Sequence, residues 1–410
     1  MLLWGLLCTF ATMIRLIVCI FVAFIIAPHA LAQKKELSQA RSYIKSGKNL
    51  DKAEKLLLGL LQADSVNREN PKIYALLYQT IRKQYDAGNE KLYLRQQYDT
   101  AALFNLTKRM FQLCEQLDSI DARPDKKGRV RPEYRKRHAE ELNAIRLNLY
   151  LGGRYFLGKN NAGEAYPYFH TYLDCAQQPL FGDYDYGDDD DTLFVQAAYW
   201  ATYTGWRENN PEHVLRYAGI ALSDTTRAPF TLQYMAEAYH ALRQDSLYAE
   251  TLSYGFQHHM QHVYFYTRLM DRYNAREQYE QGLELTEQAL QQQPDNQLFL
   301  FGKSSLLLNM GRNDESLLTS QHLIQLNDSL AEAYFNAGTA LLNQVLPLER
   351  NVRRNRKKIK ELYQQARPYM EQYRQLAPDQ KVKWAPALYK IYLNLNMGRQ
   401  FEEIDRLMKE

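Results

Sequence analysis

Glycine and proline are scarce in this chain, which has 19 Gly and 13 Pro among its 410 residues. Disordered chains are usually rich in such residues, so their scarcity argues against disorder and favours a helical protein. Cysteine is scarcer still, with four residues, which argues against a disulfide framework. The formal net charge of +4 is too small to indicate nucleic acid as a partner. With 46% hydrophobic residues, the chain can nevertheless bury a continuous core.

Motifs of catalysis are missing as well. The chain has no glycine-rich phosphate loop, no nucleophile elbow and no convincing Cys/His pair. Scattered Ser, His and Asp residues occur in any chain of this length. We therefore expect a protein that is not an enzyme and that uses no cofactor.

Residues 1–32 have the pattern of a signal peptide. An apolar run at 16–27 follows Arg15, and Ala30-Leu31-Ala32 provides the small residues of a cleavage site. We predict export to the periplasm or cell surface of a Gram-negative bacterium. The alternative is an uncleaved N-terminal membrane anchor, because residues 2–27 would nearly span a bilayer but for Arg15.

Loss of this leader would change the cysteine content and the charge. Cys114 and Cys175 would remain, and an oxidising compartment permits a disulfide between them without implying one; two buried free thiols are the default. Arg15 is the only charged residue of the leader, so the mature net charge would be 4 − 1 = +3. Met1 and Met13 both remain open as the true start, and Met13 would begin a more usual leader.

A spacing of 34 residues recurs through the C-terminal half of the chain. Leu232, Tyr266, Leu300 and Tyr334 fall at this interval, and residues three, four and seven positions later continue a mostly small or apolar pattern. A fixed period of this size indicates an array of helix–turn–helix units. In the last of these units Gly338 is small enough to let a second helix approach closely.

The pattern resembles the tetratricopeptide repeat (TPR), in which large, Leu-Gly and Tyr positions are followed by Ala-x3-Phe and then Pro. An N-terminal unit carries it as Leu149, Gly152, Gly153 and Phe156, followed by Ala165 and Phe169. The resemblance implies an all-α, right-handed superhelical solenoid of antiparallel helix pairs over 33–410. Residues 381–405 also resemble secreted repeat proteins of Gram-negative envelopes, a likeness that carries no assigned activity.

Three charged inserts lie near 123–137, 180–192 and 343–361. Inserts in repeat arrays usually form loops or extended helix ends. The first is basic and we expect a loop around its two prolines. The second is an acidic tract at 183–191 containing Tyr184 and Tyr186, which forms either a solvated loop, a segment docked on the array by its tyrosines, or a calcium loop without the EF-hand arrangement.

The third insert contains the basic run 350–360. A solvated extension of a long helix is the plainest interpretation. The alternatives are binding to anionic lipid or polysaccharide, pairing with the acidic tract, and nucleic acid, which the absence of aromatic residues disfavours. Peripheral membrane association therefore remains open.

A metal site is the other alternative. His258 and His262 would lie four residues apart on one face of a helix, a spacing that can hold zinc or copper. His259 stands where a zinc protease would need glutamate, and no third ligand is evident. A partly exposed helix end is the favoured interpretation, so we predict no metal.

The resemblance implies that the first helix of each pair lines an inner surface that binds a protein or peptide partner. We therefore predict a non-catalytic scaffold of the cell envelope, with partner-binding candidates on those first helices. They are Tyr150, Arg154, Gln233, Glu237, His240, Thr267, Asp271, Asn274, Phe301 and Phe335. The alternatives are a metal or small-ligand carrier that uses His258 and His262 or the 183–191 insert, and an architectural subunit of a membrane-associated or polysaccharide-handling assembly. Partner identity and oligomeric state stay open.

Overall fold

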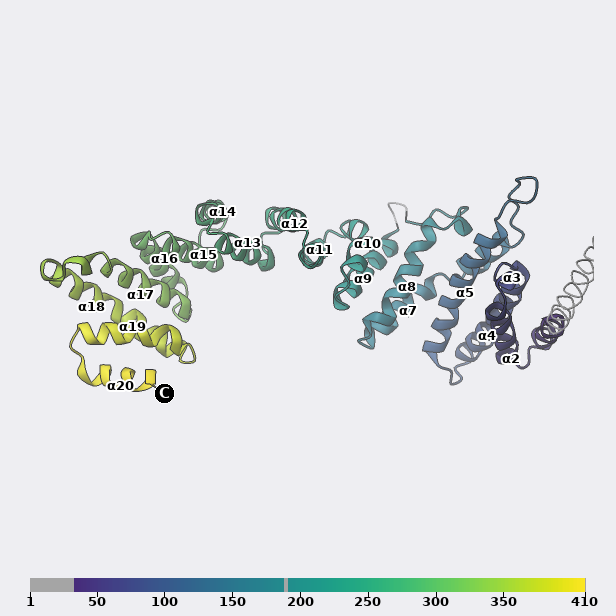
Figure 1. Ribbon diagram of the computed structural model, residues 1–410, viewed down its shortest axis with the longest axis horizontal. Coiled ribbons are helices and arrows are strands. Elements are labelled where there is room, and N and C mark those ends of the chain that lie inside the picture. Colours follow the sequence, from purple (N-terminus) through teal and green to yellow (C-terminus); the bar gives the residue numbers. More distant parts are fainter. Residues whose placement is uncertain (1–32, 188–190, 410) are drawn as a thin grey trace, which may run out of the picture. The chain divides into compact units, whose positions relative to one another are not determined.

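The computed structural model describes residues 33–187 and 191–409. The chain divides into two compact units, Met1–Thr251 (unit 1) and Leu252–Glu410 (unit 2), each of which is taken by itself. Within the described residues every regular element is a helix and none is a strand (Figure 1). The prediction of an all-α fold is confirmed. The predicted signal peptide lies outside the described residues.

Unit 1 begins with a helix at 33–46. Its further helices are α2 (Leu50–Ala63), α3 (Ser65–Arg68), α4 (Pro71–Tyr93), α5 (Thr100–Asp121), α6 (Arg135–Asn143), α7 (Leu147–Gly158), α8 (Ala162–Asp174), η1 (Cys175–Gln177), η2 (Pro179–Phe181), α9 (Thr192–Arg207), α10 (Pro211–Ala221) and α11 (Ala228–Ala241). Helix α12 (Asp245–His258) contains the division between the two units.

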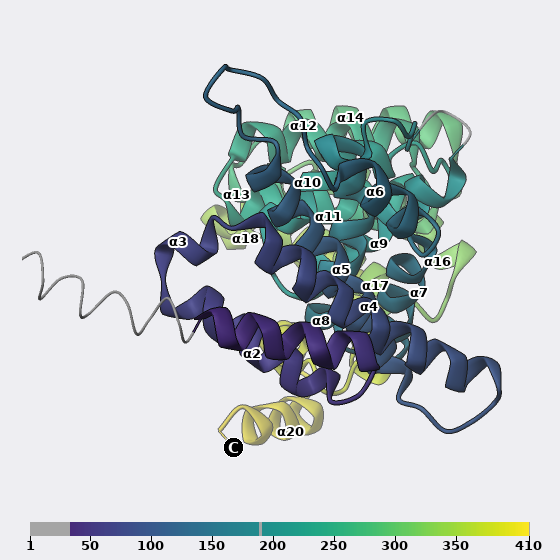
Figure 2. The same ribbon diagram turned by 90° about the vertical axis from the view of Figure 1, so that its right-hand side faces the viewer.

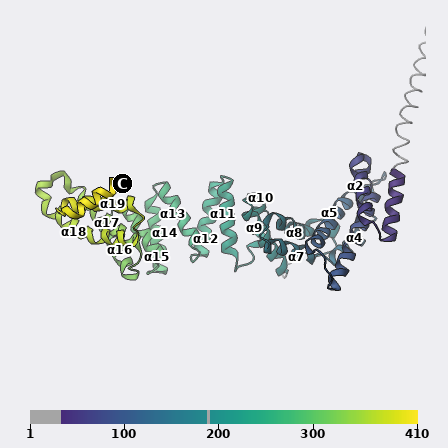
Figure 3. The ribbon, with the colours of Figure 1, turned by 90° about the horizontal axis from the view of Figure 1, so that it is seen from below.

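Unit 2 continues with helices of similar length. They are α13 (Val263–Ala275), α14 (Tyr279–Gln292), α15 (Gln297–Asn309), α16 (Asn313–Leu326), α17 (Ala331–Val345), η3 (Leu348–Asn351), α18 (Val352–Leu376), α19 (Lys381–Asn394) and α20 (Gly398–Lys409). Figure 3 shows α13, α14 and α15 as successive neighbours.

Consecutive helices joined by short turns pack side by side as antiparallel pairs, such as α13 with α14, α15 with α16 and α19 with α20. In unit 2 the first helices start at residues 263, 297 and 331, so two successive steps are 34 residues each. The next first helix, α19, starts at 381, a step of 381 − 331 = 50. The predicted period and its single break in this unit are therefore properties of the fold.

The repeated positions form the core as predicted. Leu232, Tyr266 and Leu300 are buried, and Tyr334 is half-buried against the core of unit 2. Gly338 on α17 allows the close approach expected of it, because a Cβ there would lie 2.8 Å from the Cε of Met370 on α18. The pairs are therefore held together through small residues on first helices that face large residues on second helices.

First helices end in a recurring turn that the sequence pattern did not predict. The second residue after α7, α9, α11, α13 and α19 has a left-handed backbone, with φ between 53° and 58°; these residues are Asn160, Asn209, Arg243, Glu277 and Asn396. The next N–H bonds to a carbonyl five residues back, as from Gln278 to Tyr273 at 2.9 Å. This is the Schellman arrangement, which usually employs glycine, as Gly311 does after α15.

Two long helices of unit 1 depart from the 34-residue pattern. Helix α4 has 23 residues and α5 has 22, and they pack against each other. After α5, residues 122–134 form the predicted loop, which stands out from the helices (Figure 2). Its base is fixed where the guanidinium of Arg135 donates to both carboxylate oxygens of Asp118, at 2.7 and 2.8 Å.

The acidic insert is docked on unit 1 through its tyrosines, one of the predicted alternatives. The ring of Tyr186 lies 3.7 Å from the guanidinium of Arg146, and its hydroxyl donates to Asn143 Oδ1 at 2.6 Å. Tyr184 stacks on Tyr186 with ring centroids 5.5 Å apart. Residues 188–190 of the tract lie outside the described part of the chain.

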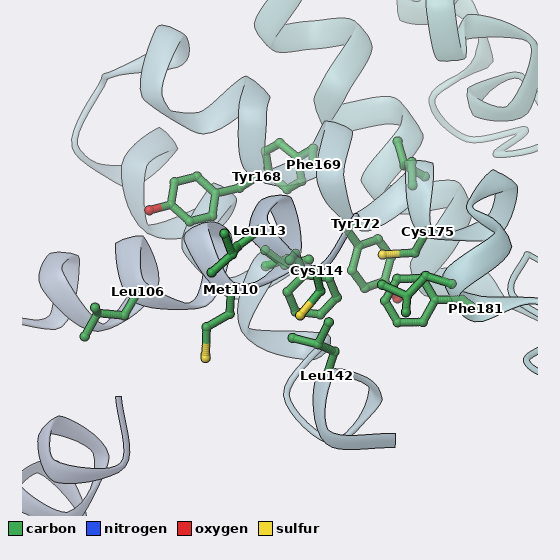
Figure 4. Close-up of a cluster of buried hydrophobic side chains, with 14 of the residues drawn as sticks. Leu106, Met110, Leu113, Cys114, Leu142, Tyr168, Phe169, Tyr172, Cys175 and Phe181 are labelled. Carbon is green, nitrogen blue, oxygen red and sulfur yellow. The ribbon is translucent and has the colours of Figure 1, made fainter. Parts of the chain in front are cut away.

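Both described cysteines are buried free thiols, as the default prediction held. Cys114 on α5 lies near Leu113 and Leu142, whereas Cys175 lies beside Phe181 (Figure 4). Burial raises the pKa of Cys175 to about 12 and that of Cys114 well above its usual value. Neither thiol is therefore activated as a nucleophile or metal ligand.

Candidate functional site

Unit 2 contains a cavity of about 280 Å³ between two consecutive first helices, α13 and α15. Both helices occupy the same position in successive repeats, as the resemblance implied for a binding surface. The cavity is lined by Tyr266, Thr267, Met270, Asp271, Asn274, Leu298, Phe301, Gly302, Ser305 and Leu306. Four predicted candidates thus meet in one place, namely Thr267, Asp271, Asn274 and Phe301. We call this cavity the α13–α15 pocket.

The apolar floor of the pocket is rigidly built. Tyr266 is buried, with its ring edge-on to Phe299 at 4.7 Å between centroids. Its hydroxyl lies 3.0 Å from Thr286 Oγ1 on α14. Burial raises the pKa of Tyr266 to about 12, so the phenol is neutral at physiological pH. The floor therefore presents an apolar, uncharged surface to any bound group.

The rim of the pocket is polar and more exposed. Asp271 is exposed and pairs with Arg268 at 3.2 Å, and Asn274 accepts a hydrogen bond from Asn309 Nδ2 at 3.1 Å. The hydroxyl of Thr267 donates to the carbonyl of Val263 or Tyr264 within its own helix. An apolar floor with a polar rim suits a partner side chain whose backbone hydrogen-bonds at the edge.

A buried polar cluster behind the pocket explains where the chain departs from the repeat pattern. Ser304 is fully buried and accepts from Asn336 Nδ2 at 2.6 Å. Ser316 Oγ donates to the carbonyl of Ser304 at 2.8 Å, and Asn336 also reaches Ser305 Oγ at 3.1 Å. Helices α15, α16 and α17 are thus joined by hydrogen bonds at positions where small apolar residues are usual. Since Ser305 lines the pocket, this cluster also orients its wall.

A second cavity, of about 270 Å³, lies in unit 1 and contains the candidate Arg154. The guanidinium of Arg154 lies 4.5 Å from the ring of Trp200 on α9. Arg207, in the same wall, donates to the hydroxyl of Tyr203 and to Asn160 Oδ1, both at 2.9 Å. A guanidinium stacked on a ring leaves its N–H edge free, so this wall can bind a carboxylate or phosphate.

The candidates on α11 have internal partners. Glu237 accepts from the indole N–H of Trp206 at 2.6 Å and from Gln233 at 3.1 Å, and it lines a smaller cavity of about 130 Å³. The ring of His240 is exposed and lies 4.9 Å from that of Tyr248. Gln233 and Glu237 therefore contribute to a separate surface of unit 1.

Tyr150 and Phe335 lie outside these three cavities. Tyr150 is 7% exposed, and its ring packs against Phe169 and Tyr172 of α8, so its predicted place on an open groove is wrong. Its hydroxyl donates to Gln196 of α9 at 3.2 Å, because α7 is covered by both α8 and α9. Phe335 is half-buried, with its ring 5.0 Å from that of Tyr373.

The histidine pair does not have the predicted helical spacing. Helix α12 ends at His258 and α13 begins after His262, so the two residues flank a turn instead of sharing one helix face. His258 stacks on Tyr254 with ring centroids 4.0 Å apart. In the described part of the chain, no group of three or more His, Cys, Asp or Glu could hold a metal ion. The acidic tract falls partly on residues 188–190, outside that part.

Across residues 33–187 and 191–409, no helix combines the length and the apolar character needed to cross a bilayer.

The fold and these cavities define a helical-repeat protein of TPR-like architecture. Solved structures of TPR proteins are similar to it. One is the C-terminal part of a TPR repeat-containing protein from Cytophaga hutchinsonii, with 11% identity, 62% of this chain and 91% of that chain covered, and a TM-score of 0.43. Yeast Tom70 has 12% identity, 93% and 91% coverage and a TM-score of 0.35. The TPR2AB domain of yeast Sti1, in a complex with pHSP90, has 11% identity, 65% and 97% coverage and a TM-score of 0.23. No family model and no curated protein matches the chain.

Proposed function

We propose that this protein is a non-catalytic scaffold that binds a peptide segment of a protein partner, and that the α13–α15 pocket receives one side chain of that segment. The observation that supports this proposal is the position of the pocket. It opens between equivalent first helices of successive repeats and is lined by four residues chosen from the sequence for that role.

The chemistry of the pocket favours an apolar or aromatic side chain. Met270, Phe301 and Leu306 supply apolar contacts, whereas Thr267 and Asn274 supply hydrogen-bonding groups at the rim. A cavity of about 280 Å³ accommodates one large side chain and is too small for a folded domain. Binding energy at such surfaces is concentrated in a few buried anchors.

Photo-crosslinking tests this proposal directly. A benzoylphenylalanine placed at Asn274, on the rim, should form adducts with the partner, whereas the same group at Leu318 on α16 should not. Leu318 is 66% exposed and does not line the pocket, so it controls for surface reactivity. Mass spectrometry of the adducts would identify the bound segment, which can then be synthesised.

A matched pair of variants determines whether the adducts depend on the pocket. Thr267→Arg should fill the pocket and abolish the adducts. Thr319→Arg on α16 replaces a threonine with the same bond to a backbone carbonyl four residues earlier, and it should leave them unchanged. Equal adducts with both variants, or with both crosslinker positions, would contradict the proposal.

We also propose that the partner is met in the cell envelope after cleavage of residues 1–32. The support is the leader pattern of the sequence, with its apolar run and small-residue cleavage site. Mass spectrometry of the protein recovered from cell fractions tests this proposal. A processed N-terminus at Gln33 in the envelope fraction is expected, and an intact leader in the cytoplasmic fraction would contradict it.

A further inference from the structure

The first part of α18 is a helical extension that the repeat does not need. Helix α18 has 25 residues, whereas the second helices α14 and α16 have 14 each, a difference of 25 − 14 = 11 residues. This extra length accounts for most of the 50-residue step between α17 and α19. The basic run of the sequence falls on it.

The cations of this extension occupy one continuous arc of the helix. At about 3.6 residues per turn, Val352, Asn355 and Ile359 share the opposite side. Ile359 is buried, and Asn355 donates to the carbonyl of Leu348 at 3.0 Å, so this side faces the protein. We call the remaining arc the basic face; it consists of Arg353, Arg354, Arg356, Lys357, Lys358 and Lys360, all exposed.

No residue of the basic face forms an ion pair within residues 33–187 and 191–409. Like charges instead stand four residues apart, as Arg353 and Lys357 do, and as Arg354 and Lys358 do. Such pairs repel and destabilise a helix. The protein therefore keeps this cluster of charge without internal compensation.

The basic face is also at the unfavourable end of its helix. The N-terminus of a helix carries a partial positive charge that favours acidic residues, and α16 has Asp314 and Glu315 in its first turn. Helix α18 has Arg353 and Arg354 there and no acidic residue. An arrangement that opposes helix stability at every level indicates a role outside folding.

The chemistry of the basic face fits an extended anionic surface. Aromatic residues, which would stack on nucleic acid bases, are absent from residues 348–360. Exposed apolar side chains flank the cations instead, because Val352 is 53% and Leu346 is 54% exposed. Clustered Lys and Arg beside apolar side chains on a helix are typical of binding to anionic lipid headgroups.

We infer that the basic face docks the protein peripherally on a bilayer surface that contains anionic lipids. The attraction comes from several cations that act together, with Val352 and Leu346 entering the headgroup region. The α13–α15 pocket takes no part in this contact, so the inference stands or falls independently of the proposed function.

Vesicle co-sedimentation tests the inference with the protein as cells process it. Phosphatidylcholine vesicles with and without phosphatidylglycerol are compared, so that any contribution from the apolar leader is common to both. Binding should be stronger to the vesicles that contain phosphatidylglycerol, and the difference should shrink as salt screens the charges. Equal binding to both vesicles would overturn the inference.

The decisive variant replaces Arg353, Arg354, Lys357 and Lys358 with glutamine. Each removed cation should weaken binding several-fold, so the four together should lower binding to anionic vesicles by roughly 100-fold or more. The matched control replaces four exposed cations of unit 1, Arg41, Lys45, Lys52 and Arg68, and should change binding by only a few-fold. An equal loss in both variants would show that net charge alone is responsible and would contradict the inference.

Two further readouts separate lipid binding from a loss of folding and from binding to soluble polyanions. Thermal melting of the quadruple variant should be unchanged or higher, because the substitutions remove like-charge repulsion; a lower melting temperature that accounts for the lost binding would contradict the inference. Single-stranded DNA and a soluble acidic polysaccharide serve as competing polyanions. Binding to either of them in the absence of vesicle binding would assign the basic face to that class of partner instead.

Discussion

The phenol hydroxyl of Tyr266 on α13 occupies the space in front of Gly302 on α15 where the Cβ of any other residue would lie. The two residues thereby set the distance between consecutive first helices, and both line the α13–α15 pocket. The hydroxyl is held in place by Thr286 at 3.0 Å. The pocket therefore depends on a glycine whose role is steric.

A double-mutant cycle tests this contact. Gly302→Ala should lower stability by about 1–3 kcal/mol, because the added methyl displaces a buried ring. Tyr266→Phe alone should lower it by about 1 kcal/mol, since the bond to Thr286 is lost. In the Gly302→Ala background, Tyr266→Phe should instead raise stability, because it removes the atom that clashes. Simple additivity of the two changes in melting would contradict the contact.

The glycines that face second helices should differ in their tolerance of alanine. A Cβ on Gly205 of α9 would lie 2.7 Å from the backbone nitrogen of Val214, whereas a Cβ on Gly338 would meet the flexible end of Met370. Backbone cannot move aside as a methionine can, so Gly205→Ala should cost about 1–3 kcal/mol and Gly338→Ala less than about 1 kcal/mol. Gly338→Leu should cost as much as Gly205→Ala.

Gly219→Ala provides the control for this series. It lies in α10 with no atom within 4 Å of the added Cβ. There the substitution should raise stability by about 0.5–1 kcal/mol through helix propensity. Urea unfolding followed by circular dichroism measures all four variants, and equal effects of Gly205→Ala and Gly219→Ala would refute the close approach at Gly205.

Glu277 is a site where glycine should stabilise the protein. It has φ of 55° in the turn after α13, a conformation that costs other residues about 1 kcal/mol more than glycine. Glu277→Gly should therefore raise stability by about 0.5–1 kcal/mol. The same substitution at exposed Glu284, inside α14, should lower it by about 1 kcal/mol. A loss of stability at both positions would argue against the left-handed turn.

The stability of unit 1 should depend on pH through Glu115. Burial and then Asp174 raise the pKa of Glu115 to about 7, and its Oε1 is buried without a partner among the described residues. A raised carboxyl pKa means that the folded state holds the proton, so this stability is complete below pH 4.5 and is lost as pH rises through 7. The loss amounts to about 3 kcal/mol.

His138 acts in the opposite direction over part of this range. Burial and then Arg137 lower its pKa to about 4, against an unfolded value of 6.5. The stability it contributes is therefore complete above pH 6.5 and is lost as pH falls through 4. Glu115→Gln should remove one of the two opposed slopes, so stability should rise between pH 4.5 and 6.5 and exceed that of the wild type at pH 8.

Urea midpoints at pH 5, 6.5 and 8 measure this effect. Glu90→Gln on the exposed side of α4 provides the control and should follow the wild type at all three values. A Glu115→Gln variant with the same pH profile as the wild type would show that Glu115 is charged in the folded protein at neutral pH.

The periodic part of the fold was predictable because each repeat places the same apolar residues on the same helix face. Leu232, Tyr266 and Leu300 could be assigned to the core from spacing alone. The hydrogen-bonded cluster of Ser304, Ser316 and Asn336 could not, because polar residues at core positions show their partners only in three dimensions. The turns at Arg243 and Glu277 were hidden for a related reason, since neither residue favours a positive φ.

The candidate site was predictable in part for the same reason. Thr267, Asp271 and Asn274 lie beside core positions on a first helix, and the adjoining helix adds Phe301. Tyr150 follows the same rule and is buried, because a helix inside an array is covered on two sides and its free arc is narrower than the spacing suggests. His258 and His262 failed because helix α12 ends four residues before the expected face is complete.

The most direct test of the peptide-binding account is a calorimetric titration of the crosslinked partner segment, synthesised as a peptide, into the wild type, Thr267→Arg and Thr319→Arg. Filling the α13–α15 pocket should weaken binding by at least about tenfold in Thr267→Arg, whereas Thr319→Arg should bind as the wild type does. Equal affinity in all three proteins would contradict the account.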